Sequence, residues 1–181
     1  AERANRQSSV LAELDIEPKR FVLATIHRAE NTDDRETLSH IIDGLAEVAR
    51  RLPVVFPAHP RTRAALETAG LWDQANKSLM IVPPVGYFDM VLLERSALVV
   101  ATDSGGVQKE AYFHGTPCVT LRTETEWVEL VELGWNRVQP PTSASDISSA
   151  IEAASESLGR LGTPYGDGQS AVHIVRSLKQ G

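Results

Sequence analysis

A glycine-containing turn offers the clearest chemistry in this sequence. It reads TDSGG over residues 102–106 and follows the apolar run 97–101. Adjacent glycines let the backbone approach a ligand closely and adopt positive φ angles, and unpaired N–H groups at the start of the next helix favour an anion. We therefore predict that Ser104, Gly105 and Gly106 hold a phosphate group. The alternative is a plain tight turn. The spacing matches neither G-x-G-x-x-G nor a Walker loop, which disfavours NAD and ATP.

Two other charged positions fit the same chemistry. Glu110 lies one turn into the helix that follows the glycines, where a carboxylate can accept hydrogen bonds from two neighbouring sugar hydroxyls. The polar group HRAEN, residues 27–31, directly follows another apolar run. An imidazole with a pKa near about 6.5 can hold a proton, so His27 is predicted to offset charge on a phosphate leaving group. Arg28 stands beside it. The alternative is that this group caps the next helix.

Two more segments follow apolar runs. The loop PPVGYF, residues 83–88, combines a stiff proline pair with two aromatic rings. Pro84, Tyr87 and Phe88 suit a flat base held by backbone hydrogen bonds, although aromatic residues near a helix start are more often core residues. Arg122 follows the run 117–121 and either binds a phosphate or pairs with a nearby glutamate at the surface. No H-x-x-x-H or C-x-x-C spacing occurs, so neither a metal nor another cofactor is expected, and no G-x-S-x-G supports a hydrolase.

Length and composition exclude several classes of protein. The chain has 181 residues, which is the size of one domain with a substantial core. Its net charge is −6 and its basic residues are not clustered, so neither nucleic acid nor an anionic membrane is an expected partner. The apolar runs are far shorter than the roughly 20 residues that span a bilayer. A single cysteine fits a reducing cytoplasm.

Apolar runs and amphipathic segments alternate along the chain, and this pattern sets the expected fold. Strands are predicted at residues 21–27, 54–58, 79–84, 97–101, 117–121 and 136–139. A first helix is predicted with its N-cap at residues 31–33 and its buried face at residues 38–49. Further helices are predicted at residues 62–69, 87–95, 106–114, 126–133, 144–158 and 170–178. Six such repeats with short connections predict an α/β fold with a doubly wound parallel sheet of about six strands. Ligands of such sheets bind beyond the carboxyl ends of the strands, which is where the polar groups occur.

The first residues form a separate pattern. The chain opens without Met, and Val10, Leu11 and Leu14 share one helical face before Pro18. We expect residues 1–18 to be a connector helix from a longer protein and residues 19–181 to be the domain itself. The alternative is a mature chain whose Met has been removed.

Seven motifs in this order resemble the non-hydrolysing UDP-N-acetylglucosamine 2-epimerases. They are HRAEN, HPRT, PP-x-x-Y, TDSGGVQKEA, GTPCVTLR, TEWVEL and YGDGQSA, and they extend from about residue 20 to 178. The resemblance implies two Rossmann-like domains facing a cleft, the GT-B arrangement, of which this sequence is similar to the C-terminal, UDP-binding half. It further implies a cytoplasmic homodimer whose N-terminal domain, absent here, carries the carboxylates that move the proton at C2.

The resemblance also implies a reaction and a role for each site residue. UDP-GlcNAc and UDP-ManNAc interconvert through elimination of UDP to a 2-acetamidoglucal and its re-addition. By this resemblance His27 contacts the departing diphosphate, Glu110 binds the ribose, and Arg122 lines the same pocket. Residues 104–106 would hold the diphosphate, and uracil would lie against the loop from Pro84 to Phe88. Many relatives carry a second arginine where Ala29 stands.

Three alternative functions remain at this point. A hydrolysing epimerase, which releases ManNAc and UDP, would differ mainly outside this sequence. A GT-B glycosyltransferase is disfavoured because every motif follows the epimerase pattern. A UDP-sugar sensor without catalysis is the third. We expect the isolated chain to be inactive, because proton removal at C2 needs a base in a closed cleft.

Overall fold

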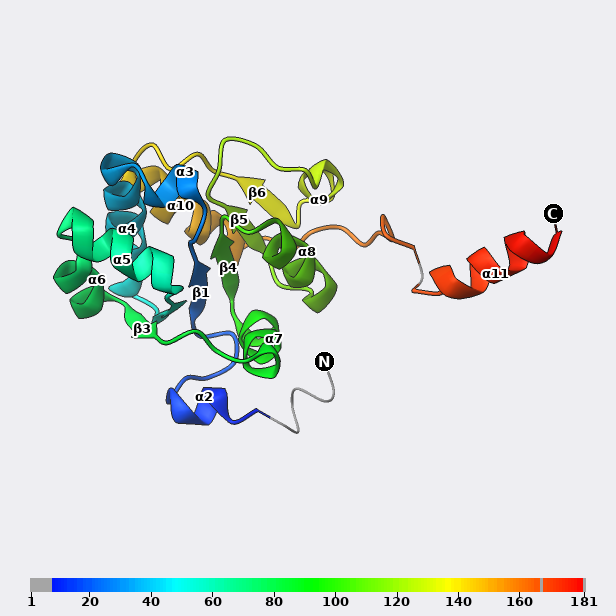
Figure 1. Cartoon of the computed structure of the whole chain (residues 1–181), viewed down its shortest axis with the longest axis horizontal. Helices are drawn as coiled ribbons and strands as arrows, with labels where there is room; N and C mark the ends of the chain where they lie inside the picture. The colour runs from blue at the N-terminus through cyan, green and yellow to red at the C-terminus, as the bar shows by residue number, and fades with distance from the viewer. Residues whose placement is uncertain (1–7, 167, 181) are drawn as a thin grey trace.

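Six parallel strands form the centre of the computed structural model, which describes residues 8–166 and 168–180 (Figure 1). The strands are β1 (Val22–Thr25), β2 (Val54–Pro57), β3 (Met80–Val82), β4 (Val99–Thr102), β5 (Cys118–Thr120) and β6 (Asn136–Val138). Their order across the sheet is β3-β2-β1-β4-β5-β6, and each neighbouring pair is parallel. This is the doubly wound order, with its switch point between β1 and β4. The expected fold class is confirmed.

Helices follow the strands and cover the sheet. In the described residues they are α2 (Val10–Glu13), α3 (Ala29–Thr32), α4 (Arg35–Ala49), α5 (Pro60–Ala69), α6 (Trp72–Ser78), α7 (Tyr87–Ser96), α8 (Gly105–His114), α9 (Val128–Glu132), α10 (Ala144–Ser155) and α11 (Ser170–Gln180). The sequence pattern did not indicate α3 or α6, which are too short to show a helical period. The helices predicted at residues 126–133 and 144–158 are longer than α9 and α10.

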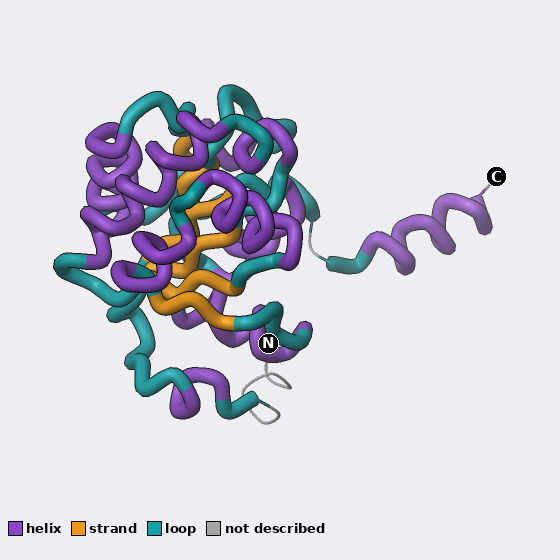
Figure 2. Tube along the Cα trace, turned by 60° about the vertical axis from the view of Figure 1, so that its left-hand side comes forward, coloured by secondary structure: helices purple, strands orange, loops and turns teal. Residues whose placement is uncertain are grey.

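The strands supply side chains to both faces of the sheet. Successive residues of a strand point to opposite faces. On β1, Val22 and Ala24 join the apolar core under α4 and α10, whereas Leu23 joins the core under α7 and α8. All four residues of β1 and of β4 are buried, which is why these strands read as continuous apolar runs. Figure 2 shows the sheet lying between the helical layers.

The two ends of the described chain differ in how they meet this layered body. The N-terminal helix was expected over residues 1–18; residues 1–7 lie outside the described part, and α2 spans four residues. Val10 and Ile16 are buried in the core beside α7. At the other end α11 projects away from the sheet (Figures 1 and 2). Its exposed large apolar side chains are Val172, Ile174, Val175 and Leu178.

Within the described ranges, no helix is long and apolar enough to cross a membrane.

Candidate functional site

Strands β1 and β4 bring two distant segments to one edge of the sheet. Thr25 pairs with Thr102 in the parallel register, so the residues that follow them leave the sheet side by side. The two threonine hydroxyls are hydrogen-bonded at 2.6 Å, and the Thr102 hydroxyl also accepts a hydrogen bond from the Ser104 N–H at 3.0 Å. Because the strand order reverses here, this edge is where doubly wound folds bind ligands.

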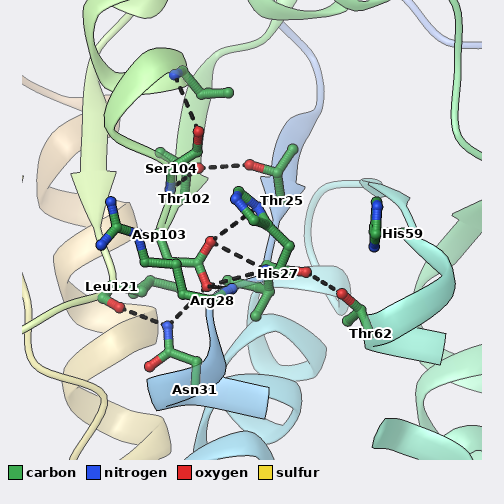
Figure 3. Close-up of polar contacts among 12 residues, drawn as sticks. Thr25, His27, Arg28, Asn31, His59, Thr62, Thr102, Asp103, Ser104 and Leu121 are labelled. Carbon is green, nitrogen blue, oxygen red and sulfur yellow. Dashed lines mark hydrogen bonds and ion pairs between the residues drawn. The ribbon is translucent and has the colours of Figure 1, made fainter. Parts of the chain in front are cut away.

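A buried carboxylate connects the two segments (Figure 3). Asp103 is fully buried, and its oxygens accept hydrogen bonds from the N–H groups of His27 at 3.1 Å and of Arg28 at 3.0 Å. The side-chain amide of Asn31 donates a third, also at 3.0 Å. The His27 Nδ1 atom lies 3.4 Å from Asp103 Oδ1, and 45% of the imidazole is exposed. Asp103 therefore holds the loop after β1 and orients the imidazole beside the turn that precedes Ser104.

Sequence reasoning missed the role of Asp103. The motif TDSGG does not by itself indicate a role for this residue, because its partners lie more than 70 residues earlier in the chain. The signal that could have found it is an acidic residue directly after a fully buried strand, since a buried carboxylate needs several donors. Asn31 is an anchor as well, because its amide also donates to the Leu121 carbonyl at 2.9 Å. That bond joins the loop after β1 to the segment after β5.

The turn itself ends in a capped helix. Ser104 is the N-cap of α8, and its hydroxyl accepts a hydrogen bond from the Val107 N–H at 3.5 Å. The first N–H groups of a helix have no partner within it. Those of Gly105 and Gly106 therefore face the edge of the sheet with the positive end of the helix dipole. Gly106 is exposed, and a Cβ built there would have the Ser104 hydroxyl as its nearest neighbour, at 3.8 Å.

The expected positive φ angles at the glycines are wrong. Positive-φ glycines in the described chain are those at positions 70, 115, 134, 166 and 168, whereas Gly105 and Gly106 belong to α8. Gly105 leaves room for the protein's own side chains. It is buried, a Cβ there would overlap the Glu126 carboxylate, and its carbonyl accepts a hydrogen bond from Trp127 Nε1 at 2.7 Å. The smaller residue thus lets the segment after β5 pack on the start of α8.

Two arginines and two glutamates form a charged group beside this turn. Arg122 Nε donates to Glu30 at 3.1 Å and its Nη1 to Glu126 at 2.8 Å, with only 10% of the arginine side chain exposed. The Arg28 guanidinium lies 4.0 Å from Glu30 and 3.9 Å from Glu126. The backbone N–H of Glu126 and the Arg122 guanidinium hold the pKa of the Glu126 carboxyl below its usual range. The surface pairing that was the alternative for Arg122 is therefore present.

The remaining candidates occupy two helices. Glu110 is half-buried on α8. Tyr87 and Phe88 begin α7 with 71% and 39% exposure, so the core alternative for these rings is wrong. They contact each other edge to face, with ring centroids 5.7 Å apart. Pro84 is exposed in the loop before α7. The structure places these residues on α7, α8 and the connecting loop, and none of them belongs to the described hydrogen bonds of Asp103.

No group of three histidine, cysteine, aspartate or glutamate side chains in the described residues is arranged to hold a metal ion. The groups described at the ends of β1, β4 and β5 are backbone N–H groups, the His27 imidazole, the Arg28 and Arg122 guanidinium groups and carboxylates. Such a set can bind an anion and stabilise negative charge that develops on it.

A doubly wound parallel sheet with polar and charged side chains at its switch point defines a Rossmann-like domain, here the C-terminal half of a GT-B arrangement. The particular family follows from comparison. The family model described as UDP-N-acetylglucosamine 2-epimerase matches residues 1–179. The chain belongs to this family.

The similar proteins are named as 2-epimerases, and each matches this chain over about half of its own length. A "UDP-N-acetylglucosamine 2-epimerase homolog" of Methanococcus maripaludis is 44% identical over 94% of this chain and 47% of its own length. A "UDP-2,3-diacetamido-2,3-dideoxy-D-glucuronate 2-epimerase" of Pseudomonas aeruginosa is 48% identical over 87% of the chain and 44% of its own. The crystal structure of UDP-GlcNAc 2-epimerase from Methanocaldococcus jannaschii in complex with UDP-GlcNAc and UDP has a TM-score of 0.85 at 36% identity, covering 99% of this chain and 51% of that one. The chain spans about half the length of these relatives and corresponds to their C-terminal half.

Proposed function

We propose that this chain is the UDP-binding half of an epimerase that interconverts UDP-GlcNAc and UDP-ManNAc by elimination and re-addition of UDP. The observation that supports it most is the Ser104-capped start of α8 beside the His27 imidazole, at the switch point of a chain in this family. A solved relative contains both UDP-GlcNAc and UDP.

The diphosphate is proposed to lie at the start of α8. The N–H groups of Gly105 and Gly106 would donate to its oxygens, and the helix dipole would favour its charge. Exposure of Gly106 supports this position, because ligand oxygens can reach its backbone. The two guanidinium groups of Arg28 and Arg122 bring positive charge to the same edge, each already balanced by a glutamate. Binding of the diphosphate would compete with Glu126 for these donors.

The proposed chemical role of His27 follows from its surroundings. Elimination breaks the bond between C1 and the diphosphate oxygen as a proton leaves C2, and negative charge accumulates on the departing UDP. An imidazole held by Asp103 and open to solvent on its other side can donate to that oxygen. Return of a proton to the opposite face of C2, with return of UDP to C1, gives the epimer.

The nucleoside contacts complete the proposal. Glu110 would accept hydrogen bonds from the two ribose hydroxyls. Uracil would lie against the loop from Pro84 to Phe88, where the exposed rings of Tyr87 and Phe88 provide an aromatic surface. No step in this scheme uses a metal or another cofactor.

The complete protein is proposed to be a cytoplasmic homodimer with a second, N-terminal domain. Relatives about twice as long as this chain support the second domain. The exposed apolar side chains of α11 support it further, because such a face is usually covered in a complete protein. The base that removes the proton from C2 would come from that domain, and the isolated chain would be inactive.

A second substrate is a specific alternative. The relative from Pseudomonas aeruginosa is named for a UDP-2,3-diacetamido-2,3-dideoxy-D-glucuronate and is 48% identical to this chain. The UDP portion of both substrates is the same, so the contacts proposed above do not distinguish them. A hydrolysing epimerase, which releases ManNAc and UDP, would use the same UDP contacts as well.

Proton NMR of the anomeric region tests the proposed reaction directly. With UDP-GlcNAc, the full-length gene product is expected to produce the UDP-ManNAc signal, and the 181-residue chain alone is expected to produce none. Free ManNAc would instead indicate a hydrolysing enzyme. Turnover of UDP-2,3-diacetamido-2,3-dideoxy-D-glucuronate by the full-length gene product, with no turnover of UDP-GlcNAc, would support the second substrate. Epimer formation by the isolated chain would contradict the proposed absence of the C2 base.

A further inference from the structure

A buried glutamate lies behind the proposed ribose-binding residue. Glu94 is on α7 and is fully buried, and no donor among the described residues is hydrogen-bonded to either of its carboxyl oxygens. An unpaired buried carboxylate is costly. The carboxyl group that interacts with Glu94 is that of Glu110, which lies on α8, the helix that packs against α7. Two carboxylates can satisfy each other only if one carries a proton.

The charges around Glu94 favour its neutral form. The pKa of the Glu94 carboxyl is raised to about 8. Burial is the largest cause, and the charge of Glu110 and the hydrogen bond with it add to the rise. Its other neighbour on α8 is His114, whose Nε2 lies 3.7 Å from Glu94 Oε2. Burial and the positive charges of Arg95 and Lys19 lower the pKa of that histidine, so it supplies little positive charge near neutral pH.

The third element packed near Glu94 is β5, which carries Cys118. Burial raises the pKa of that thiol to about 12, and the charge of Glu94 contributes to the rise. The thiol is thus neutral as well. Glu94 therefore faces one half-buried carboxylate and two neutral groups, and at neutral pH it is a hydrogen-bond donor.

We propose that Glu94 is a positioning residue for nucleotide binding: its carboxyl group donates a hydrogen bond to Glu110 and fixes the carboxylate that receives the ribose hydroxyls. The inference rests on the proposed role of Glu110 as the ribose-binding residue. A carboxylate already held by one donor loses less rotamer freedom when the ligand binds. Its remaining lone pairs stay directed at the two hydroxyls.

Two substitutions separate positioning from packing. Glu94→Gln keeps the shape and supplies an amide donor at every pH, whereas Glu94→Leu keeps the volume and removes the donor. Each is titrated calorimetrically with UDP and with 2′,3′-dideoxyuridine diphosphate, which lacks the ribose hydroxyls. The ratio of the two affinities isolates the ribose contact, because base and phosphates are the same in both ligands.

At pH 7 the ratio is expected to fall about tenfold in Glu94→Leu and to stay within about threefold of the original in Glu94→Gln. Between pH 7 and pH 9 the ratio of the unaltered chain is expected to fall, because ionised Glu94 becomes an acceptor and repels Glu110. The ratio of Glu94→Gln is expected to stay constant.

Three results would overturn the inference. An unchanged ratio in Glu94→Leu, an equal loss in both variants, or a ratio for the unaltered chain that does not change with pH would each show that Glu94 does not act through the ribose contact. If Glu94→Leu does not fold, the glutamine variant and the pH series decide alone. If the unaltered chain binds UDP but does not distinguish the two ligands, the proposed role of Glu110 fails first.

Discussion

Replacing Asp103 with alanine should destabilise the chain by at least about 3 kcal/mol and abolish UDP binding. The substitution leaves the N–H groups of His27 and Arg28 and the amide of Asn31 without their acceptor. The Asn31 amide is buried and the two N–H groups are partly buried, and each such donor left unpaired costs about 1–3 kcal/mol. The loop after β1 then loses its connection to β4, and the imidazole loses the group that orients it.

Asp103→Asn is the sharper form of this test. Asparagine preserves the size of the side chain but presents an amide N–H₂ group, in place of one oxygen, to the donors around it. We expect the free energy of unfolding to fall by about 1–3 kcal/mol. Urea denaturation measures the stability, and calorimetry measures the binding of UDP. Asp73→Asn is the matched control, because Asp73 is exposed on α6 and should change stability by less than about 0.5 kcal/mol. An Asp103→Asn chain as stable as the original, with the same UDP affinity, would refute the anchoring role.

Replacing His27 with alanine in the full-length gene product should lower kcat about 10²- to 10⁴-fold. That is the usual contribution of a positioned acid or base. The side chain is 45% exposed, so its loss should leave the fold intact. UDP affinity should fall much less than kcat, because the backbone N–H groups at the start of α8 remain in place.

His59→Asn provides the control for that experiment. His59 follows β2 at the same edge of the sheet, and its Nδ1 accepts a hydrogen bond from the Arg61 N–H at 3.2 Å as the N-cap of α5. Asparagine preserves a cap, so kcat should change by less than about threefold. Equal losses from the two substitutions, or full turnover in His27→Ala, would remove the proposed role in UDP departure.

Sequence patterns predicted the sheet well because the strands are local and fully buried. The run 97–101 is apolar throughout since β4 has neighbours on both sides and helices on both faces. The capped start of α8 was also predictable, as Ser104 and the glycines that follow it are contiguous. Short helices were not, because one turn such as α3 gives no periodic signal.

The interactions inside the site were harder to predict because they depend on distant partners. Gly105 was interpreted as a residue chosen for positive φ, whereas it makes room for Glu126, 21 residues later. Asp103 accepts from a loop that precedes it by more than 70 residues. The sequence does not decide between the two roles of Arg122, because its pairing with Glu30 depends on where β1 and β5 end relative to each other. Only the three-dimensional arrangement shows these pairings.

Calorimetric titration of the chain with UDP and with uridine tests the central claim most directly. The account predicts that UDP binds much more tightly than uridine, that EDTA leaves this binding unchanged, and that Ser104→Trp abolishes it by filling the space before α8. Glu110→Ala should weaken it about tenfold. Ser149→Trp, on the exposed side of α10, should bind as the original chain does. Equal affinity for UDP and uridine, or unchanged UDP affinity in Ser104→Trp, would contradict a diphosphate site at this helix start.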